Sequence, residues 1–380
     1  MGAYLQLGHE SWSLLGEDDI GEYVGLVLSP VNDDPSYVHD RLGRLGDQLQ
    51  DLEIILDPQL YNPSAEKGEL PTWSHFPSDF ETADRSDINW WIAVSQRVVE
   101  AAVGIEADAI CTPAPIPRVA TDEYYRFVVE VGDAAYAIAE RAKLDTLLTV
   151  IVRLRDLADP RRALAWASIL SATDCERIYL VFLDEDTQQR EPFGDGAELA
   201  TAVHFVRLLS DNLHVHVAFC AHDLMLWKFA GATDISSGKW MNTRRFTPGR
   251  WRDEDSAGRQ VAYWNEDPLL TLLRDQDVTR LDRDGWFNGR SFTDNPAAGR
   301  ILDILRRGTG EAWLKHSWIQ YLRWVSNATA SLSSGDDTFL AAADGRWAEV
   351  ENRRILFVDR FNNGNHARVW LNAAREGGAR

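Results

Sequence analysis

One stretch in the middle of the chain contains the unit that decides the fold. Residues 177–220 read RIYLVFLDEDTQQREPFGDGAELATAVHFVRLLSDNLHVHVAFC. Arg177–Leu183 is an apolar run of strand length, Ala197–Leu209 has apolar residues at helical spacing, and Leu213–Cys220 is a second strand-length run. The two runs are continuous rather than alternating, which is typical of parallel strands buried on both faces. The stretch therefore predicts a strand–helix–strand unit.

The same rhythm extends in both directions from this unit. Helical spacing recurs at Asn89–Val103 and at Thr121–Ala142. Six further runs have the length of a strand, namely Tyr23–Leu28, Leu52–Leu56, Ala107–Cys111, Leu147–Val152, Ala232–Ile235 and Val261–Trp264. Alternating strands and helices predict a (β/α)8 TIM-type barrel over residues 1–296, with an open doubly wound sheet as the alternative.

The pattern changes after residue 296, where no further strand-length run occurs. Ala297–Arg307 and Glu311–Ala328 instead have the spacing of amphipathic helices. Many of the 15 tryptophans of the chain lie in this last third. We therefore expect a mostly helical, Trp-rich C-terminal extension over residues 297–380, with an aromatic contact surface for a protein partner.

Composition limits the class of protein. The chain has 380 residues, and 39 basic against 59 acidic side chains give a net charge of −20. This charge argues against a general nucleic-acid coat, because binding to phosphates relies on a positive surface. No run reaches the ~20 apolar residues that a membrane span needs. Three scattered cysteines and an N-terminus without an early Lys or Arg predict a cytoplasmic protein, with no membrane contact.

Polar residues follow several of the predicted strands. In a barrel such residues face one shared pocket, and carboxylates that meet there perturb each other's ionisation, as acid/base pairs require. Each one could instead be a turn former or a helix cap. Arg153 is unusual because it ends a buried run, where it needs an anion or a carboxylate partner. The candidates are Asp57, Gln59, Arg153, Asp184, Asp234 and Ser236.

The most distinctive segment, residues 231–252, reads GATDISSGKWMNTRRFTPGRWR. From residue 239 to residue 252 it contains five basic side chains and no acidic one. Glycine lets backbone N–H groups approach an anion, and arginine clamps phosphate bidentately. We therefore expect an anion or nucleic-acid phosphate site here, with an ion-pair network to the acids at 253–255 as the alternative. Its candidate residues are Ser236, Gly238, Lys239, Arg244 and Arg245.

Three segments together resemble the tRNA-guanine transglycosylases and their DNA-modifying relatives, which are (β/α)8 barrels. They are IILDPQLY at 54–61, FLDE at 182–185, and the segment from His222 to Arg244. The resemblance implies that Asp57 is an acid/base residue, that Asp184 reads the base edge, and that Asp234 is a covalent nucleophile. The zinc ligands of that family have no counterpart here, and we expect no metal and no cofactor.

These observations lead to a first hypothesis on function. It is a barrel enzyme that acts on a nucleobase or nucleotide-like ligand, through base exchange of the transglycosylase (pentosyltransferase) type. One alternative is a non-catalytic barrel subunit of a larger complex, such as one that processes nucleic acid. Another alternative is a metal-dependent hydrolase that uses Asp184, Asp186 and His222.

Overall fold

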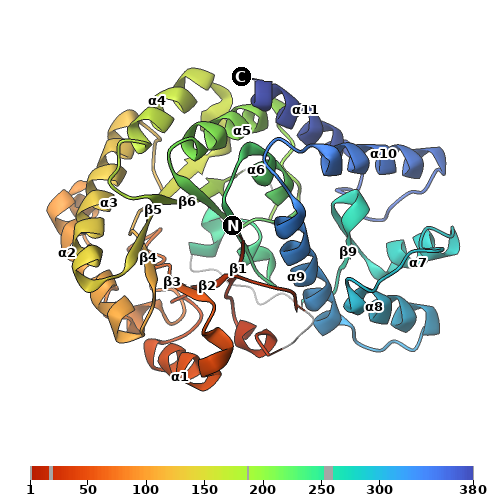
Figure 1. Ribbon diagram of the computed structural model, residues 1–380, viewed down its shortest axis with the longest axis horizontal. Helices are drawn as coiled ribbons and strands as arrows, with labels where there is room; N and C mark the ends of the chain where they lie inside the picture. The colour runs from red at the N-terminus through yellow and green to blue at the C-terminus, as the bar shows by residue number, and fades with distance from the viewer. Residues whose placement is uncertain (1, 17–19, 186–187, 252–259, 380) are drawn as a thin grey trace.

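Eight parallel strands close into a barrel in the computed structural model, which describes residues 2–16, 20–185, 188–251 and 260–379 (Figure 1). The strands are β1 (Ala3–Gln6), β2 (Gly25–Leu28), β3 (Glu53–Leu56), β4 (Ala109–Cys111), β5 (Asp145–Arg153), β6 (Arg177–Leu183), β7 (His214–Ala218) and β8 (Asp234–Ser237). The barrel is closed where Tyr4 of β1 lies opposite Gly25 of β2 on one side and Ser236 of β8 on the other. The predicted TIM-type barrel is confirmed.

Six helices follow the strands β2 to β7 in turn. They are α1 (Pro35–Leu45), α2 (Ile88–Gly104), α3 (Asp122–Ala142), α4 (Pro160–Leu170), α5 (Gly196–Ser210) and α6 (Leu224–Ala230). Local chemistry fixes where several of them begin. The carboxylate of Asp195 accepts hydrogen bonds from the amides of Ala197 and Glu198 at the start of α5, and the Thr121 hydroxyl accepts one from Tyr124 at the start of α3.

The first and last strands differ from the prediction. The run Val261–Trp264 is not a barrel strand, because β9 (Trp264–Glu266) pairs only with β10 (Thr271–Leu273), in a two-stranded antiparallel sheet outside the barrel. The missing barrel strand is β1, which is only four residues long. The run expected to be the seventh strand is therefore the eighth, and the basic segment from Gly238 onward follows the last strand of the barrel.

Two of the C-terminal helices pack against the barrel. The C-terminal helices are α7 (Asp275–Arg283), α8 (Pro296–Arg307), α9 (Leu314–Ser331), α10 (Thr338–Asn352) and α11 (Asn365–Ala379). α9 packs against β1 and β8, where it takes the place of the helix that would follow the last strand, and α11 packs along α5 (Figure 1). The Tyr23 hydroxyl donates to the carbonyl of Leu322, which ties α9 to the start of the barrel.

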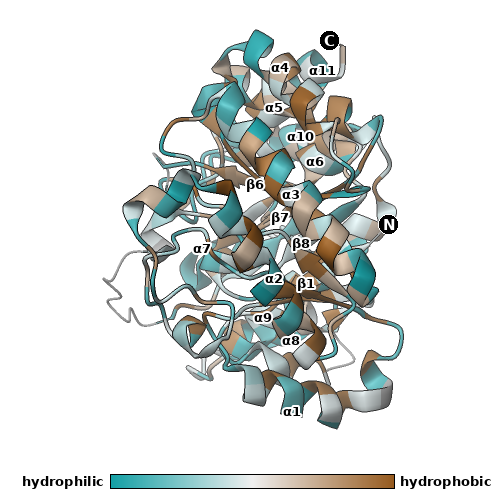
Figure 2. Cartoon of the chain, turned by 90° about the vertical axis from the view of Figure 1, so that its left-hand side faces the viewer, coloured by the Kyte–Doolittle hydropathy of each residue, from teal (hydrophilic) through white to brown (hydrophobic). Residues whose placement is uncertain are grey.

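Two apolar cores organise these elements. The larger core fills the space between strands and helices, and Figure 2 shows β1, β6 and β8 mainly in brown, between helices with teal outer faces. The smaller core surrounds Trp264 and includes Leu281, Ile301 and Trp313 from the hairpin, α7, α8 and the start of α9. It therefore contains residues from both sides of the predicted boundary at residue 296. Among the described residues, no helix is long and apolar enough to cross a membrane.

Candidate functional site

The barrel brings three of the candidate residues to its carboxyl-terminal end. Asp57 directly follows β3, Arg153 is the last residue of β5, and Asp184 directly follows β6. Side chains at this end of a parallel barrel converge on one region, where barrel enzymes hold their substrates. This part of the site was predicted from the polar residues that follow long apolar runs.

Asp57 is held by its own loop. Its carboxylate accepts one hydrogen bond from the amide of Gln59, at 3.0 Å, and another from the Tyr61 hydroxyl, at 2.9 Å. Gln59 has a φ of 55°, in the left-handed region that costs energy for any residue other than glycine. Its side-chain oxygen accepts from the Ser29 hydroxyl and from the amide of Val31. The loop therefore fixes the direction of the Asp57 carboxylate.

An aromatic cluster closes the barrel over this loop. The Tyr61 ring lies 4.9 Å from that of Phe246 and 5.0 Å from that of Trp251, both in the loop after β8, and Phe219 after β7 completes the cluster. Burial and the nearby Asp57 carboxylate raise the pKa of Tyr61 well above its usual value. Asp57 itself is only 1% exposed. The mouth of the barrel is thus filled by side chains at this point.

Arg153 has the partners that its buried position requires. Its guanidinium donates to the carbonyls of Pro117 and Arg118, and its Nε lies 3.5 Å from the Glu185 carboxylate. Arg155 approaches the same carboxylate at 2.8 Å. Two arginines therefore hold Glu185, the neighbour of Asp184, in a fixed position.

The structure does not bring Asp234 to this region. Asp234 begins β8, and the next residue, Ile235, lies opposite Ala3, the first residue of β1. Its carboxylate accepts a hydrogen bond from the amide of Gly2 at 2.8 Å, and burial raises its pKa. Strands rise about 3.3 Å per residue, so Asp234 lies about 10 Å below the carboxyl-terminal end of its strand. Asp234 and Asp57 are at opposite ends of the barrel.

The lower end of the barrel has its own ion pair. Arg177, the first residue of β6, donates to both carboxylate oxygens of Glu53 on β3, and the Tyr4 hydroxyl donates to Glu53 at 2.5 Å. Arg177 also lowers the pKa of Asp234, although burial has the larger and opposite effect. In barrels this end contributes to stability rather than to chemistry.

Three basic side chains of the segment after β8 are directed into the protein. Lys239, Arg244 and Arg245 are each no more than 3% exposed. Lys239 donates to the carbonyl of Glu10, and burial lowers its pKa to about 8. Arg244 donates to the carbonyls of Gly238 and Lys239, and its guanidinium lies 3.3 Å from the centre of the Tyr321 ring.

The other candidates of this segment are also occupied by contacts inside the fold. Arg245 donates to the carbonyl of Glu191 and lies 3.5 Å from the centre of the Phe193 ring. Ser236 is fully buried, with its hydroxyl 3.4 Å from the side-chain oxygen of Gln6. A side chain at Gly238 would come within 2.4 Å of the Gln6 carbonyl. The acids at 253–255 and Arg252 lie outside the described residues.

A cleft of about 720 Å3 lies beside the aromatic cluster, between the segment after β6 and the loop after β8. Asp184 and Glu185 form part of its wall. Sequence reasoning missed the rest, because Gln189, Arg190 and Tyr263 follow no strand directly. Arg190 stacks over the Tyr263 ring at 5.1 Å and pairs with Asp359. The lining residues are Asp184, Glu185, Gln188, Gln189, Arg190, Met241, Thr247, Pro248, Gly249 and Tyr263.

The residues expected for a metal site are not brought together in the part of the chain that the structure describes. No group of three or more His, Cys, Asp or Glu side chains there is arranged to hold a metal ion. His222 lies 2.6 Å from the Asn265 side-chain oxygen, and burial lowers its pKa to about 3. Asp186, the third residue of that hypothesis, lies outside the described residues.

Comparisons with known proteins find no family and only distant structural matches. No family model and no curated protein matches the chain. One similar structure is a xylose isomerase domain protein from Planctomyces limnophilus, at 10% identity, with 57% of this chain and 72% of that chain covered and a TM-score of 0.32. A GH18 chitinase from Pseudoalteromonas aurantia matches at 7% identity, with 64% and 95% covered and a TM-score of 0.39. A D-tagatose 3-epimerase-like protein matches at 13% identity, with 65% and 92% covered and a TM-score of 0.33.

The resemblance to tRNA-guanine transglycosylases is wrong. No family model supports it, and the similar structures include isomerase and epimerase barrels instead. The geometry gives the physical reason, because the expected nucleophile, Asp234, and the expected acid/base residue, Asp57, lie at opposite ends of the barrel. Short matches around strand ends are frequent in parallel barrels, since every strand is an apolar run that needs a polar residue to end it.

Proposed function

We propose that the chain is a barrel enzyme whose substrate binds in the cleft beside the aromatic cluster, with Asp184 as its acid or base. One observation carries this proposal. Asp184 lines the cleft directly after β6, while the adjacent Glu185 is held by Arg153 and Arg155. A carboxylate on a rigid strand end, beside a second carboxylate that is held in place, is an arrangement suited to proton transfer.

The lining of the cleft favours a small, neutral or cationic molecule with several hydroxyl or amide groups. Gln188, Gln189, Thr247 and the Tyr263 ring provide hydrogen-bonding groups and one flat apolar surface. Three basic side chains of the segment after β8, Lys239, Arg244 and Arg245, are turned inward, and the chain has a net charge of −20. A sugar, a polyol or a nucleoside belongs to this class. A nucleic-acid backbone is less suited, because its phosphates need exposed cations.

The test is a thermal-shift screen of the purified protein against sugars, polyols, nucleosides and inorganic phosphate, followed by product analysis for each ligand that binds. We expect a rise in Tm with a hydroxyl-rich ligand. In Asp184→Asn we expect turnover to fall by about a hundredfold or more, which is the usual contribution of a positioned acid or base. The control is Asp174→Asn. Asp174 is an exposed carboxylate that precedes β6, whereas Asp184 follows it. Equal turnover in Asp184→Asn and in the control would contradict the assignment.

A second candidate function is a non-catalytic barrel subunit. The enclosed Asp57 favours it, because a carboxylate that already accepts from Gln59 and Tyr61 offers little to a substrate. The tryptophans of the C-terminal region do not add support. Trp324, Trp347 and Trp370 are at most 7% exposed and belong to the core. This candidate would be favoured if no ligand of the screen raised the Tm and one protein co-purified stably in a fixed ratio.

A further inference from the structure

A second cleft lies outside the barrel, where β9, the segment before α8, α9 and α10 meet. Its volume is about 900 Å3, and none of its lining residues belongs to the cleft beside the aromatic cluster. Pockets of about 300–1,000 Å3 hold small-molecule ligands in proteins. We call this cleft the outer groove. The lining residues used in the argument below are Asn265, Gln320, Trp324, Asn327, Phe339 and Ala342.

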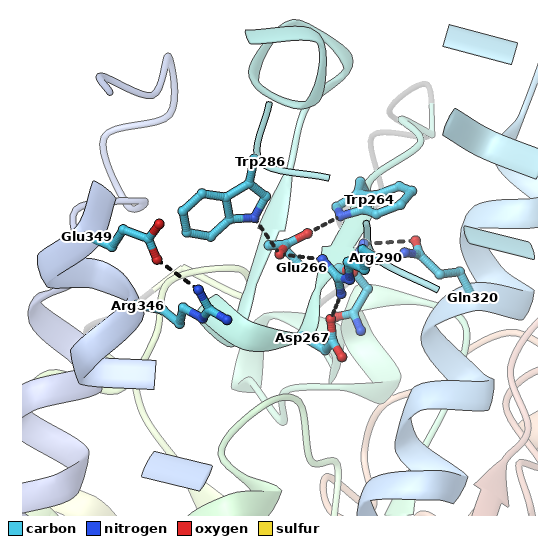
Figure 3. A network of polar contacts seen from close by, with 9 residues as sticks. Trp264, Glu266, Asp267, Trp286, Arg290, Gln320, Arg346 and Glu349 are labelled. Carbon is cyan, nitrogen blue, oxygen red and sulfur yellow. Dashed lines mark hydrogen bonds and ion pairs between the residues drawn. The ribbon is translucent and has the colours of Figure 1, made fainter. Parts of the chain in front are cut away.

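One face of α9 forms a wall of the outer groove. Gln320, Trp324 and Asn327 follow one another at positions i, i+4 and i+7, so they lie on the same side of the helix. The side-chain oxygen of Gln320 accepts from the amide of Asn265 at 2.9 Å, and its nitrogen donates to the carbonyl of Asn265 at 3.0 Å (Figure 3). Gln320 thus pairs with β9 as a neighbouring strand would, which fixes this wall against the floor of the groove.

Asn265 brings an unpartnered amide to the floor of the groove. It is 2% exposed, and its side-chain oxygen lies 2.6 Å from Nε2 of His222. Among the residues that the structure describes, its side-chain nitrogen has no hydrogen-bond partner. A buried donor without an acceptor costs free energy and is rare in native proteins. Because Asn265 lines the groove, a ligand can supply the missing acceptor.

Asn327 offers the complementary group on the α9 wall. It is exposed, and its side-chain nitrogen donates weakly to the carbonyl of Asp294, at 3.4 Å. Its side-chain oxygen has no partner within the described part of the chain. The groove therefore presents an amide donor and an amide acceptor. Hydroxyl groups both donate and accept, so a ligand with several hydroxyl groups can satisfy both.

The arginines on the floor and on the α10 wall already pair with carboxylates. Arg290 donates to Glu266 at 2.7 Å and also to Asp267, and Arg346 pairs with Glu349 at 2.8 Å (Figure 3). Charges that are balanced in this way give a free ion little net attraction. A neutral ligand is therefore better suited to this groove than an ion.

Two aromatic side chains give the groove an apolar surface. Trp324 is 7% exposed and packs against the His222 ring at 4.7 Å, which fixes its orientation. Phe339 at the start of α10 is 41% exposed. The carbon–hydrogen face of a sugar ring is apolar, and it can pack on such rings while the hydroxyl groups at its edge remain free to form hydrogen bonds.

We propose that the outer groove binds a neutral saccharide. One sugar ring packs against Trp324 and Phe339, and its hydroxyl groups contact the side-chain amides of Asn265 and Asn327. This site goes beyond the proposed function, because it lies outside the barrel and shares no lining residue with the cleft that contains Asp184. Binding in the outer groove needs no turnover in the barrel.

The experiment is titration calorimetry of the full-length chain with methyl β-glucopyranoside, cellobiose, maltose and lactose. Glucuronate and glucosamine are the charged analogues, and adenosine is a flat neutral molecule of another class. The titrated protein contains Gln188→Trp, which places a bulky ring at an exposed residue of the other cleft and so excludes binding there. We expect at least one neutral saccharide to bind saturably, at millimolar concentration or tighter, and the charged analogues and adenosine to bind more weakly.

A second blocking variant assigns the binding to the outer groove. Ala342 is an exposed residue of α10 in the groove lining, and Ala342→Trp fills the groove without replacing a buried side chain. Added to Gln188→Trp, it should abolish saccharide binding. The matched control is Ala172→Trp, because Ala172 is exposed and belongs to neither cleft. Since the cleft that contains Asp184 is filled in every titrated protein, failure of the proposed function leaves this result unchanged.

Single substitutions test the individual contacts. Asn265→Asp keeps the oxygen beside His222 and removes only the donor, so we expect binding to weaken tenfold or more. We expect Asn327→Ala and Phe339→Ala each to weaken it about three- to tenfold, as the loss of one neutral contact does. Leu356→Ala is the control for Phe339→Ala, because Leu356 is 76% exposed and lies outside the groove lining.

Three results would each overturn the proposal. The first is that no saccharide binds to folded Gln188→Trp protein. The second is that binding is undiminished by Ala342→Trp, or equal in Asn327→Ala, Phe339→Ala and Leu356→Ala. The third is that a charged analogue or adenosine binds more tightly than every neutral saccharide. Circular dichroism verifies that each variant is folded.

Discussion

His216 illustrates how single residues are constrained inside this barrel. It lies on β7, is 1% exposed, and packs between the rings of Tyr4 and Tyr179 at 4.7 and 5.2 Å. Within the described residues, neither of its ring nitrogens has a hydrogen-bond partner. Burial, with a smaller contribution from Arg177, lowers its pKa to about 3. The imidazole of the folded protein therefore stays neutral at pH values at which an exposed histidine binds a proton.

This burial predicts a pH-dependent difference between the wild type and His216→Phe. An unfolded histidine binds a proton below pH ~6.5, whereas the folded His216 does not, so the wild type loses stability relative to the variant as the pH falls. The expected difference in the free energy of unfolding grows by about 1.4 kcal/mol per pH unit between pH 6 and pH 4. Urea titrations at pH 7, 6, 5 and 4 measure it.

The matched control for this prediction is His39→Phe, because His39 is an exposed residue of α1. Its difference from the wild type should stay constant across the same pH range. A constant difference for His216→Phe as well would mean that the folded protein protonates His216 in place.

The sequence predicted the environment of some candidate residues better than that of others. Asp57 and Asp184 follow long apolar runs, so their position past a strand was visible without a structure. Asp234 lies inside a run of only four residues, Ala232–Ile235, and a shift of two residues in that strand moved it from one end of the barrel to the other. The inward direction of Lys239 and Arg244 depends on carbonyl groups and rings far along the chain, which no local pattern contains.

At the scale of elements, length decided which strands could be recognised. β6 is seven residues long and was predicted to the residue, and β5, with nine residues, contains the whole predicted run Leu147–Val152. β1 has four residues, and one of them is Gln6, whose side chain points inward and donates to the Tyr179 hydroxyl. A strand this short is held by its two neighbours in the closed barrel rather than by its own sequence. Val261–Trp264 has similar apolar character, but its partner is β10.

The contact of α11 with α5 depends on one small residue. A side chain at Gly377 would lie 2.3 Å from the carbonyl of Ala200 and 2.8 Å from Val203. Gly377→Ala should therefore push the helices apart and lower the free energy of unfolding by about 1–3 kcal/mol. Gly345→Ala on α10 is the matched control, because no atom lies within 4 Å of its added methyl group. There the change should stabilise the helix, by up to about 1 kcal/mol.

Chemical denaturation of the two alanine variants provides the measurement. Destabilisation of both by the same amount would show that helix packing at Gly377 is looser than the short distances indicate. Stabilisation of both would lead to the same conclusion.

At the scale of the whole molecule, the C-terminal helices are in direct contact with the barrel. Ser237 at the end of β8 contacts the Tyr321 hydroxyl of α9 at 2.9 Å, and Trp370 of α11 donates to the carbonyl of Phe193 at 2.8 Å. These buried contacts join residues that are far apart in the sequence. The division at residue 296 stays a prediction, whereas the fold class was predictable from the alternation of strands and helices.

A truncated chain of residues 1–295 tests this interdependence. Without α9, the apolar outer faces of β1 and β8 would be exposed to water, at a cost of about 25 cal/mol for each Å2. We expect the fragment to lack near-ultraviolet circular dichroism and to unfold without a cooperative transition. Co-expression with residues 296–380 as a separate chain should restore both signals. A cooperative transition in the fragment alone would show that the barrel is independent of α9.

The position of α9 also affects how the protein is made. β1 is synthesised first, yet the seam between β1 and β8 is covered only when residues 314–331 have left the ribosome. At about 5–20 residues per second, this interval is about 15–65 s. During that interval the barrel is incomplete, and we expect the apolar surface of β1 to be exposed to other nascent chains. Slow translation of the last third should therefore increase aggregation of this protein in the cell, and chaperones that shield early strands should increase its yield.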